Sequence, residues 1–374
     1  MLRMNRGGTP RRNDPRKSLL VYGAGRNQLP LLAAGRRRGW RIIAIDRDAG
    51  APGRSLADRF LCLSLRDHEA IVKELASEKI VGVVARITDH VGLESACRIA
   101  RDQGLASVCP GLFAAATHKT ALARQCRRAG LRTPERRSAS DPDLFEKGPI
   151  LLRPDVTIRG KAGIRRVRSV EALELALPET RSRSGNGEVD LADWIDGTDV
   201  SILVQLDRGH GRRLALWDEW VALDAEGMIR GVGCGMPSVF EEDPTSIDRV
   251  IDRLARAFPE SRGLIALSLR IDAANRPWMI EIHLGIGGDG IADRLLPAAL
   301  PGFDAFELLA RTQAGERVDP PPARARPRAL LRDGEGGAWR IVEARDAATL
   351  RARCLASLPR DWEAPRGLLP GTKP

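Results

Sequence analysis

A strand that ends at a pair of glycines is the first segment that could hold a cofactor. The apolar run 18–22 ends in Gly23-Ala24-Gly25, and Asp46 ends the next apolar run, where a ribose-binding acid stands in a dinucleotide site. The third glycine of that fingerprint would fall at Gln28, however, so the following helix cannot pack as close to the strand. The pattern therefore favours a tight strand-to-helix turn of an α/β domain, with an NAD-linked enzyme as the weaker alternative.

Glu281 is a carboxylate inside an apolar segment, residues 278–282. Burying an unpaired carboxylate is costly, so we expect a metal ion or a cationic side chain beside it. Lys119 and Lys161 are two of the few lysines in a chain that uses arginine for most basic positions. Both could be ordinary surface charges, the usual fate of lysine, or they could hold an anion.

The composition indicates a globular chain of two or three domains. It has 374 residues, of which 43% are hydrophobic and 29% charged, enough for a sizeable core. Aromatic residues make up only 4%, with a single tyrosine, Tyr22, which argues against an RNA-reading sheet or a groove that stacks single-stranded nucleic acid. No apolar run approaches the roughly 18–20 residues that cross a bilayer, so we expect no membrane partner.

The formal net charge of +11 favours a polyanionic ligand such as the phosphates of a nucleotide. Basic runs such as Arg36-Arg37-Arg38 are short, and no helix-turn-helix, zinc-finger or RNP pattern accompanies them, which argues against nucleic acid as a partner. Six scattered cysteines without a CxxC pair indicate buried, reduced thiols. Because no apolar segment follows the basic N-terminus to form a secretory signal, we expect a cytoplasmic protein.

The order of apolar segments predicts an α/β fold. Residues 1–17 lack an apolar period and are expected to be a disordered basic tail. Residues 18–113 alternate strands and helices as a small doubly wound domain does. Its strands are expected at 18–22, 41–46, 59–63 and 80–85, and its helices at 28–38, 68–77 and 92–103.

Strands predominate after residue 114. They are expected at 150–153, 164–167, 201–206, 214–223, 230–234, 264–272 and 278–282, with helices at 118–129, 170–177, 245–258 and 305–315. Residues 178–188 are expected to form an exposed loop. The last stretch, 318–374, predicts a hairpin of strands 328–332 and 339–343 and one short helix.

A set of motifs in a fixed order points to a family. The motifs are His118-Lys119, Arg153-Pro154, the Gly160–Gly163 loop, residues 192–199 and residues 278–288. In this order and spacing the chain resembles the ATP-grasp superfamily of carboxylate–amine ligases, specifically its carbamoyl-phosphate-synthase-like and D-alanine-ligase-like branches, over about residues 18–317.

The resemblance implies an architecture of α/β and α+β lobes. An N-terminal Rossmann-like pre-ATP-grasp domain would occupy 18–113, and a two-lobed ATP-grasp domain would occupy 114–317. The lid lobe would span about 114–190 and the C-terminal lobe about 191–317, followed by a small C-terminal segment, 318–374.

The resemblance also implies a reaction. ATP would lie between the two lobes, with Mg²⁺ or Mn²⁺ linking its phosphates to carboxylates of the C-terminal lobe. A substrate carboxylate would attack the γ-phosphate to give an acyl phosphate, and an amine would then displace the phosphate. The implied substrates are a small carboxylate and an amine.

Each matching position then has an implied role. Glu281 would bridge the metal to the phosphates, and Glu281 and Arg153 are the catalytic candidates. Asp193 and Ile195 would bond adenine through the backbone, while Asp199 would take the ribose hydroxyls. The phosphates would be held by cations and by the backbone of the glycine loop, namely Lys119, Arg153, Gly160, Lys161 and Gly163.

The metal site departs from the family's pattern. The family has a second carboxylate one hairpin earlier in the chain, where this sequence has Leu267, Ser268 and Leu269. The nearest acid is Asp272, and His283 replaces the family's asparagine, so Asp272 or His283 is expected to complete the metal shell. Oxygen ligands suit Mg²⁺ better than histidine does. Arg153 replaces a lysine, which changes a point charge into a planar fork.

Two functional classes therefore stay open. One is an ATP-dependent ligase that joins a small carboxylate to an amine through an acyl phosphate. The other is a degenerate ATP-grasp protein that binds a nucleotide or metabolite without efficient catalysis, in which Glu281 pairs with an arginine such as Arg270. The sequence identifies neither substrate, and it leaves a homo-oligomer open.

Overall fold

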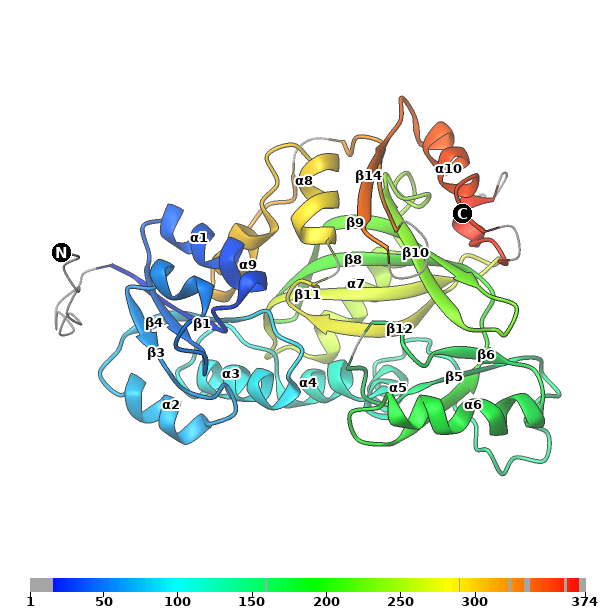
Figure 1. Ribbon diagram of the computed structural model, residues 1–374, viewed down its shortest axis with the longest axis horizontal. Coiled ribbons are helices and arrows are strands. Elements are labelled where there is room, and N and C mark those ends of the chain that lie inside the picture. The colour runs from blue at the N-terminus through cyan, green and yellow to red at the C-terminus, as the bar shows by residue number, and fades with distance from the viewer. Residues whose placement is uncertain are drawn as a thin grey trace.

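A computed structural model describes residues 16–158, 160–288, 290–321, 324–332, 337–359 and 362–369. It contains a four-stranded sheet, a seven-stranded sheet and a three-stranded sheet. In Figure 1 the four-stranded sheet lies at the left, the seven-stranded sheet in the middle and the three-stranded sheet at the lower right. The expected basic tail falls almost wholly outside the described residues.

The four-stranded sheet confirms the predicted doubly wound unit. Its strands are all parallel in the order β3-β2-β1-β4. Every residue of β1 and β2 is buried, as expected of a sheet with helices on both faces. The strands are β1 (Ser18–Tyr22), β2 (Arg41–Ile45), β3 (Arg59–Leu61) and β4 (Ile80–Ala85), and the helices are α1 (Leu29–Arg37), α2 (His68–Leu75) and α3 (His90–Asp102).

The glycine pair after β1 forms a tight turn, as the pattern favoured. Gly23 has a φ of +89°, and a side chain there would meet the buried side chain of Gln28 at 3.0 Å. Asp46 accepts a hydrogen bond from the backbone N–H of Ala24 at 2.8 Å. The acid that would bind ribose in a dinucleotide site is therefore used by the turn itself, which weakens the NAD alternative.

The seven-stranded sheet has the order β12-β11-β8-β9-β10-β13-β14, with every pair antiparallel. The predicted C-terminal hairpin forms, and it extends this sheet instead of standing apart, while its expected turn at 333–337 lies mostly outside the described residues. The strands are β8 (Thr198–Asp207), β9 (His210–Leu223), β10 (Ile229–Met236), β11 (Arg262–Ile271), β12 (Pro277–Leu284), β13 (Arg328–Arg332) and β14 (Trp339–Glu343).

Helices cover both faces of the seven-stranded sheet. One face packs on α4 (Pro110–Thr117), α5 (Lys119–Arg128) and α7 (Thr245–Ala257) through a shared apolar core. The other face joins the four-stranded unit through α8 (Leu296–Ala299) and α9 (Ala305–Gln313), which share a core with α1. A short helix, α10 (Ala347–Leu355), packs on the C-terminal hairpin. Helix α4 was not predicted.

The three-stranded sheet is antiparallel, in the order β6-β5-β7, and carries one long helix. Its elements are β5 (Ile150–Pro154), β6 (Arg165–Val167), α6 (Val170–Ser182) and β7 (Val189–Asp193). The prediction of an exposed loop from Pro178 onwards was wrong over its first turn, because α6 continues to Ser182. The Thr180 hydroxyl donates to the Gly163 carbonyl at 2.8 Å and helps to hold this extra turn in place.

The cysteines are free, as predicted, but not all are buried. Cys126, Cys234 and Cys354 are buried, while Cys62 is exposed, because it follows the short edge strand β3. No helix in the described part of the chain is both long enough and apolar enough to cross a membrane.

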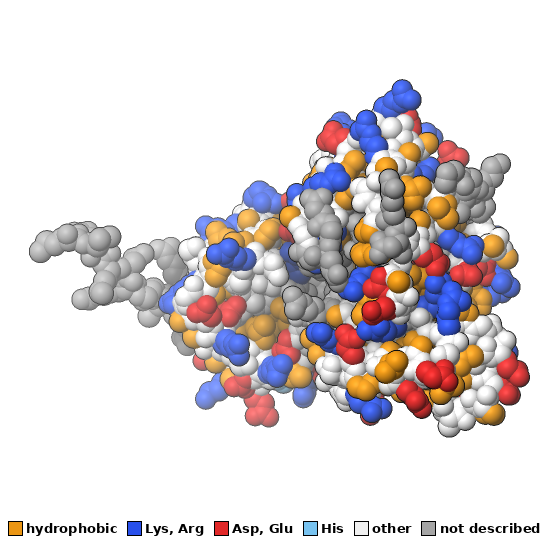
Figure 2. Space-filling model, turned by 45° about the vertical axis from the view of Figure 1, so that its right-hand side comes forward, with side chains coloured by type: hydrophobic (Ala, Val, Ile, Leu, Met, Phe, Trp, Pro, Cys, Tyr) orange, Lys and Arg blue, Asp and Glu red, His pale blue; other side chains and the backbone are white. Residues whose placement is uncertain are grey.

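Basic and acidic side chains are interspersed over the face of the molecule shown in Figure 2. Many of the arginines form ion pairs at the surface, for example Arg66 with Asp89 at 2.7 Å and Arg276 with Asp272 at 2.7 Å. On this face the excess of positive charge is spread out and does not form one broad basic surface.

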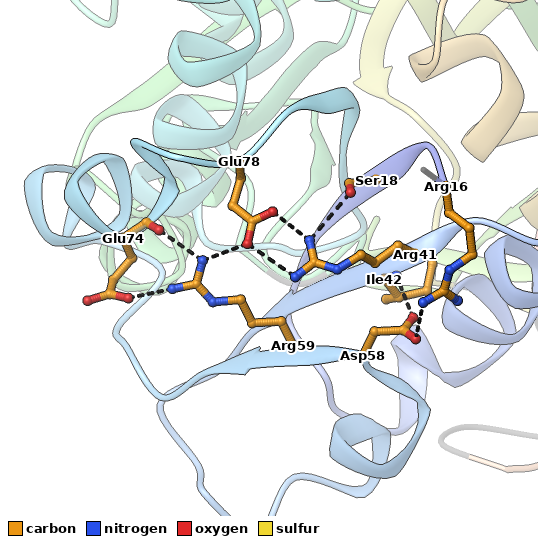
Figure 3. A network of polar contacts seen from close by, with 8 residues as sticks. All are labelled: Arg16, Ser18, Arg41, Ile42, Asp58, Arg59, Glu74 and Glu78. Atoms are coloured by element: carbon orange, nitrogen blue, oxygen red, sulfur yellow. Dashed lines mark hydrogen bonds and ion pairs between the residues drawn. The ribbon is translucent and has the colours of Figure 1, made fainter. Parts of the chain in front are cut away.

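Arginines also join the strands of the parallel sheet (Figure 3). Glu78, only 12% exposed, accepts hydrogen bonds from Arg41 at 2.5 and 3.1 Å and from Arg59 at 2.8 Å. Burial alone would raise the pKa of Glu78, but the two guanidinium groups outweigh it and hold that pKa below its usual value. This carboxylate ties β2 and β3 to the end of α2.

We expect Glu78→Gln to lower the free energy of unfolding by about 1.5–3 kcal/mol at pH 7, since it removes charge-assisted hydrogen bonds. The pKa of Glu78 is lowered by folding, so its contribution is present above the unfolded-state pKa and is lost as pH falls through the folded-state pKa. The difference from wild type should therefore shrink below about pH 4 in urea titrations. Glu74→Gln, at a carboxylate that is 48% exposed, is the matched control and should change stability by less than about 0.5 kcal/mol. Equal effects of the two variants would contradict this account.

Candidate functional site

One face of the seven-stranded sheet collects the predicted polar residues through strand register. Glu281 of β12 lies opposite Ser268 of β11, which lies opposite Ser201 of β8. In the next row, Arg270 of β11 lies opposite Asp199 of β8, which lies opposite Glu219 of β9. The intervening residues point to the other face and fill the core beneath.

Glu281 lies between a lysine and a histidine. It accepts a hydrogen bond from the buried Lys119 Nζ at 2.5 Å, and its other oxygen lies 3.4 Å from His283 Nε2. Burial alone would raise the pKa of Glu281, but Lys119 and His283 hold it well below its usual range. Desolvation would lower the pKa of His283, yet Glu281 raises it above its ordinary value. The cation expected beside Glu281 is therefore Lys119, and the pairing with Arg270 proposed for a degenerate protein does not occur.

Lys161 reaches the same face from the three-stranded sheet's loop. Its Nζ donates to Glu219 at 3.2 Å, while its aliphatic stem lies over Gly231 of β10. Burial would lower the pKa of Lys161, but Glu219, Asp199 and Glu281 raise it. Glu281 therefore acts electrostatically on both Lys161 and Lys119.

The glycine loop is shaped for a sharp reversal. Gly160 and Gly163 have φ values of +49° and +76°, the left-handed region that other residues rarely adopt. Ile164 N–H donates to the Lys161 carbonyl at 3.3 Å, which closes the turn. Lys161 is thereby placed at the loop's tip over β9 and β10.

Arg153 is close to Glu281's strand but is already paired. Its Nε donates to Asp190 at 2.9 Å and its Nη1 to the Ile280 carbonyl at 3.1 Å, and both side chains of the ion pair are buried. Asp190 also accepts from Arg136 at 2.7 Å. Arg153 thus joins the three-stranded sheet to β12, and its planar fork makes contacts that a lysine could not all make at once.

The groups expected to contact a nucleoside already have partners within the chain. The backbone N–H of Asp193 donates to the Glu135 carbonyl at 2.8 Å, and its carboxylate binds Arg137 at 2.6 and 2.9 Å. Asp199 accepts from Arg270 Nε and Nη2, both at 2.8 Å, and the Ile195 carbonyl accepts from Arg270 Nη1 at 3.1 Å.

Asp272 is not brought to Glu281. It lies in the β11–β12 turn, where it accepts from Arg276 at 2.7 Å and from the Trp278 indole at 2.9 Å. Strand register puts Ser268 opposite Glu281 instead. An Asp in a tight turn caps backbone N–H groups, which explains this placement.

No group of three or more His, Cys, Asp or Glu residues in the described ranges is placed to share a metal ion. Mg²⁺ is usually held by one or two carboxylates together with substrate phosphates, so a protein-only cluster is not required. Glu281 fits that arrangement as a single carboxylate. His283 fits it poorly, because it is a nitrogen ligand tied to Glu281.

Sequence reasoning missed two further residues of this site, Glu219 and Ser201. Glu219 pairs with Lys161 and accepts from the Ser201 hydroxyl, which lies 3.1 Å from the Ser268 hydroxyl. The serines connect the Glu219 and Glu281 sides of the site. The signal available was weak: Glu219 interrupts an apolar strand in the same way as Glu281 does.

The C-terminal segment also borders the site, which the sequence did not predict. The backbones of Glu363 and Leu223 bond to each other at 2.9 and 3.3 Å, and Arg366 lies 3.6 Å from Asp196. A pocket lies between this segment and the sheet, lined by Trp194, Asp196, Gly197, Asp199, Glu219, Val221, Leu223, Arg270 and residues 363–367.

Comparison with known proteins identifies the fold. The chain is similar to the L-amino acid ligase from Bacillus licheniformis, with a TM-score of 0.68 at 16% identity over 86% of this chain and 81% of that one. It is also similar to the biotin carboxylase domain of 2-oxoglutarate carboxylase from Hydrogenobacter thermophilus, solved with MgADP, ADP and bicarbonate, with a TM-score of 0.66 at 16% identity over 94% and 91% of the chains. The chain has the ATP-grasp fold.

Sequence comparison adds one relative, while no protein-family model matches the chain. A formate-dependent phosphoribosylglycinamide formyltransferase from Methanocella arvoryzae is 23% identical over 196 residues. The match spans 50% of this chain and 45% of that relative's length. The ATP-grasp assignment confirms the fold expected from the ordered motifs, whereas the domain boundaries and site residues stay predictions.

The Lys161–Glu219 pair should restrain the glycine loop. We expect Glu219→Gln to speed backbone hydrogen exchange in residues 160–167 severalfold, because the loop loses its ionic contact with β9. Glu343→Gln, which removes an ion pair with Arg328 at a carboxylate that is 65% exposed, is the control and should leave the exchange unchanged. Equal protection in wild type and Glu219→Gln would show that the pair does not order the loop.

Proposed function

We propose that this chain is an ATP-dependent ligase that joins a small carboxylate to an amine through an acyl phosphate. The observation that supports it most is the meeting of three basic side chains from three separate segments, Lys119, Lys161 and His283, on one sheet face. Opposed cations under a glycine loop suit a triphosphate, which needs charge neutralisation on several sides. The known proteins of this fold compared above include a ligase and a carboxylase domain that binds MgADP.

In the proposed reaction, a carboxylate oxygen of the substrate attacks the γ-phosphorus and ADP leaves. The amine nitrogen then attacks the acyl carbon, and inorganic phosphate leaves. Lys119 and Lys161 position the phosphates and offset their charge, which is most of what phosphoryl transfer requires of a protein. Glu281 raises the pKa of His283, which favours the positively charged form of the imidazole beside the phosphate site.

We propose that the Glu281 carboxylate binds a divalent ion that enters the site with the nucleotide. Bound Mg²⁺ or Mn²⁺ would neutralise part of the phosphate charge. Lys119 orients Glu281 for this contact, and Arg153 holds β12 against the three-stranded sheet.

We also propose a cytoplasmic location, where the six free thiols would stay reduced.

Nucleotide affinity tests the phosphate site. We expect Lys119→Ala and Lys161→Ala each to weaken ADP or ATP binding by about 1.5–3 kcal/mol, or roughly 10- to 150-fold, because each removes a charge-assisted contact. Lys147→Ala, at a side chain 68% exposed, is the control and should bind as wild type does. Calorimetry that found unchanged affinity in both test variants would overturn the assignment.

Turnover tests the reaction class. Purified protein should release ADP and phosphate only when a suitable carboxylate and amine are both present, in a panel of such pairs. One observation favours the second candidate, a nucleotide-binding protein without efficient catalysis: Ser268 stands where the family has a metal carboxylate. Nucleotide binding without release of ADP across the panel would select that candidate.

Metal dependence tests Glu281. We expect Mg²⁺ to tighten ATP binding to wild type and to have little effect on Glu281→Gln, which lacks the charged ligand. Asp272→Asn should keep the wild-type metal response, because that carboxylate is used in the β11–β12 turn. Loss of the response in Asp272→Asn but not in Glu281→Gln would reverse the assignment.

A further inference from the structure

Arg270 fills the end of the site where a nucleoside would lie. Its side chain is 10% exposed, and all three of its nitrogens donate within the site. Nε and Nη2 form a bidentate pair with Asp199, and Nη1 donates to the Ile195 carbonyl. The guanidinium is therefore fixed on both sides.

An aromatic ring also holds Arg270. Its guanidinium carbon lies 4.5 Å from the ring centroid of Trp194, a distance suited to a cation–π contact. Trp194 lies beside Ile195 on the connection between the three-stranded and seven-stranded sheets, and it borders the same pocket as Arg270 and Asp199. Arg270 and Trp194 together form one wall of that pocket.

These contacts compete with a nucleotide. Asp199 and the Ile195 backbone are the groups expected to take the ribose hydroxyls and the base, and here both are bonded to Arg270. We propose that Arg270 is an internal competitor for the nucleoside part of the nucleotide, and that its release from Asp199 sets nucleotide affinity. This inference rests on the proposed function, since it presumes that a nucleotide enters this cleft.

A second acid for the displaced guanidinium lies nearby, and it already accepts from the Trp194 indole at 2.9 Å and lies 3.6 Å from Arg366. Asp196 borders the same pocket, is exposed, and interacts electrostatically with Arg270. Movement from Asp199 towards Asp196 would keep the charge paired while freeing both oxygens of Asp199. The exchange still replaces a partly buried bidentate ion pair by a more exposed one, so nucleotide binding is opposed.

Calorimetric titration with ADP tests the proposal. We expect Arg270→Leu to bind ADP at least tenfold more tightly than wild type, because Asp199 and the Ile195 carbonyl are then open to the ligand. Arg270→Lys cannot span both acceptors and should bind with intermediate affinity. Arg276→Leu removes a half-exposed arginine from the adjacent hairpin turn and should match wild type.

The outcomes separate this inference from the proposed function. If Arg270→Leu and Arg270→Lys bind ADP as wild type does or more weakly, while Lys119→Ala still weakens binding, the competitor role is wrong and the phosphate site stands. If neither wild type nor Arg270→Leu binds ADP, both proposals fail. Thermal unfolding of each variant shows whether a change in affinity arises from loss of the fold.

Tryptophan fluorescence gives a second readout. Displacing Arg270 removes the guanidinium from Trp194, so ADP should change the emission of wild type and change that of Trp194→Phe less. The Trp194 contribution should be smaller in the response of Arg270→Leu, because only the entering nucleoside and Arg166 then act on the ring. An equal Trp194 contribution in wild type and Arg270→Leu would show that the nucleotide does not move Arg270.

Discussion

The ion pair between Lys119 and Glu281 is the contact on which the site depends. It joins the first residue of α5 to the middle of β12, and both groups are largely removed from water. Neither charge could be buried alone without a large desolvation cost, so each charge stabilises the other in its buried position. His283 lies beside the same Glu281 carboxylate. Arg153 donates to the backbone carbonyl of Ile280, the residue before Glu281. A lysine, a carboxylate and a histidine are thereby held together on one sheet face.

Two side chains of β11 occupy positions where the ATP-grasp resemblance implies a metal ligand and a nucleoside. Ser268 takes the place of a metal carboxylate and bonds to another serine, while Arg270 occupies the acceptors expected for ribose and base. Both changes lie on neighbouring positions of one face of β11. They leave fewer acidic groups on this face, and Lys119, Lys161 and His283 are the basic side chains that lie beside it.

The C-terminal hairpin and the segment after it complete the site's surroundings. Strands β13 and β14 add to the sheet that carries the site, and residues 363–367 border the pocket beside Trp194. Because Glu363 pairs with Leu223 through the backbone and with Arg166 through its carboxylate, this segment links the seven-stranded sheet to β6. A region with no assigned role in the sequence is therefore part of the cleft's outer wall.

Sequence alone determined the elements and the order of the motifs. Apolar periodicity placed the parallel strands, the long antiparallel strands and the C-terminal hairpin, and the five ordered segments led to the ATP-grasp fold. Apolar context also showed that Glu281 needed a partner. These are local properties: they depend on residue type and spacing along the chain.

Tertiary structure alone decided which charges meet. Lys119 lies 162 positions from Glu281 and Lys161 lies 58 from Glu219, so no local pattern could pair them. Asp272 is close to Glu281 in sequence, yet the turn directs it elsewhere, and register puts Ser268 in the facing position. Arg270 pairs with Asp199 and not with Glu281 for the same reason, since neighbours across a sheet are set by register and not by distance along the chain.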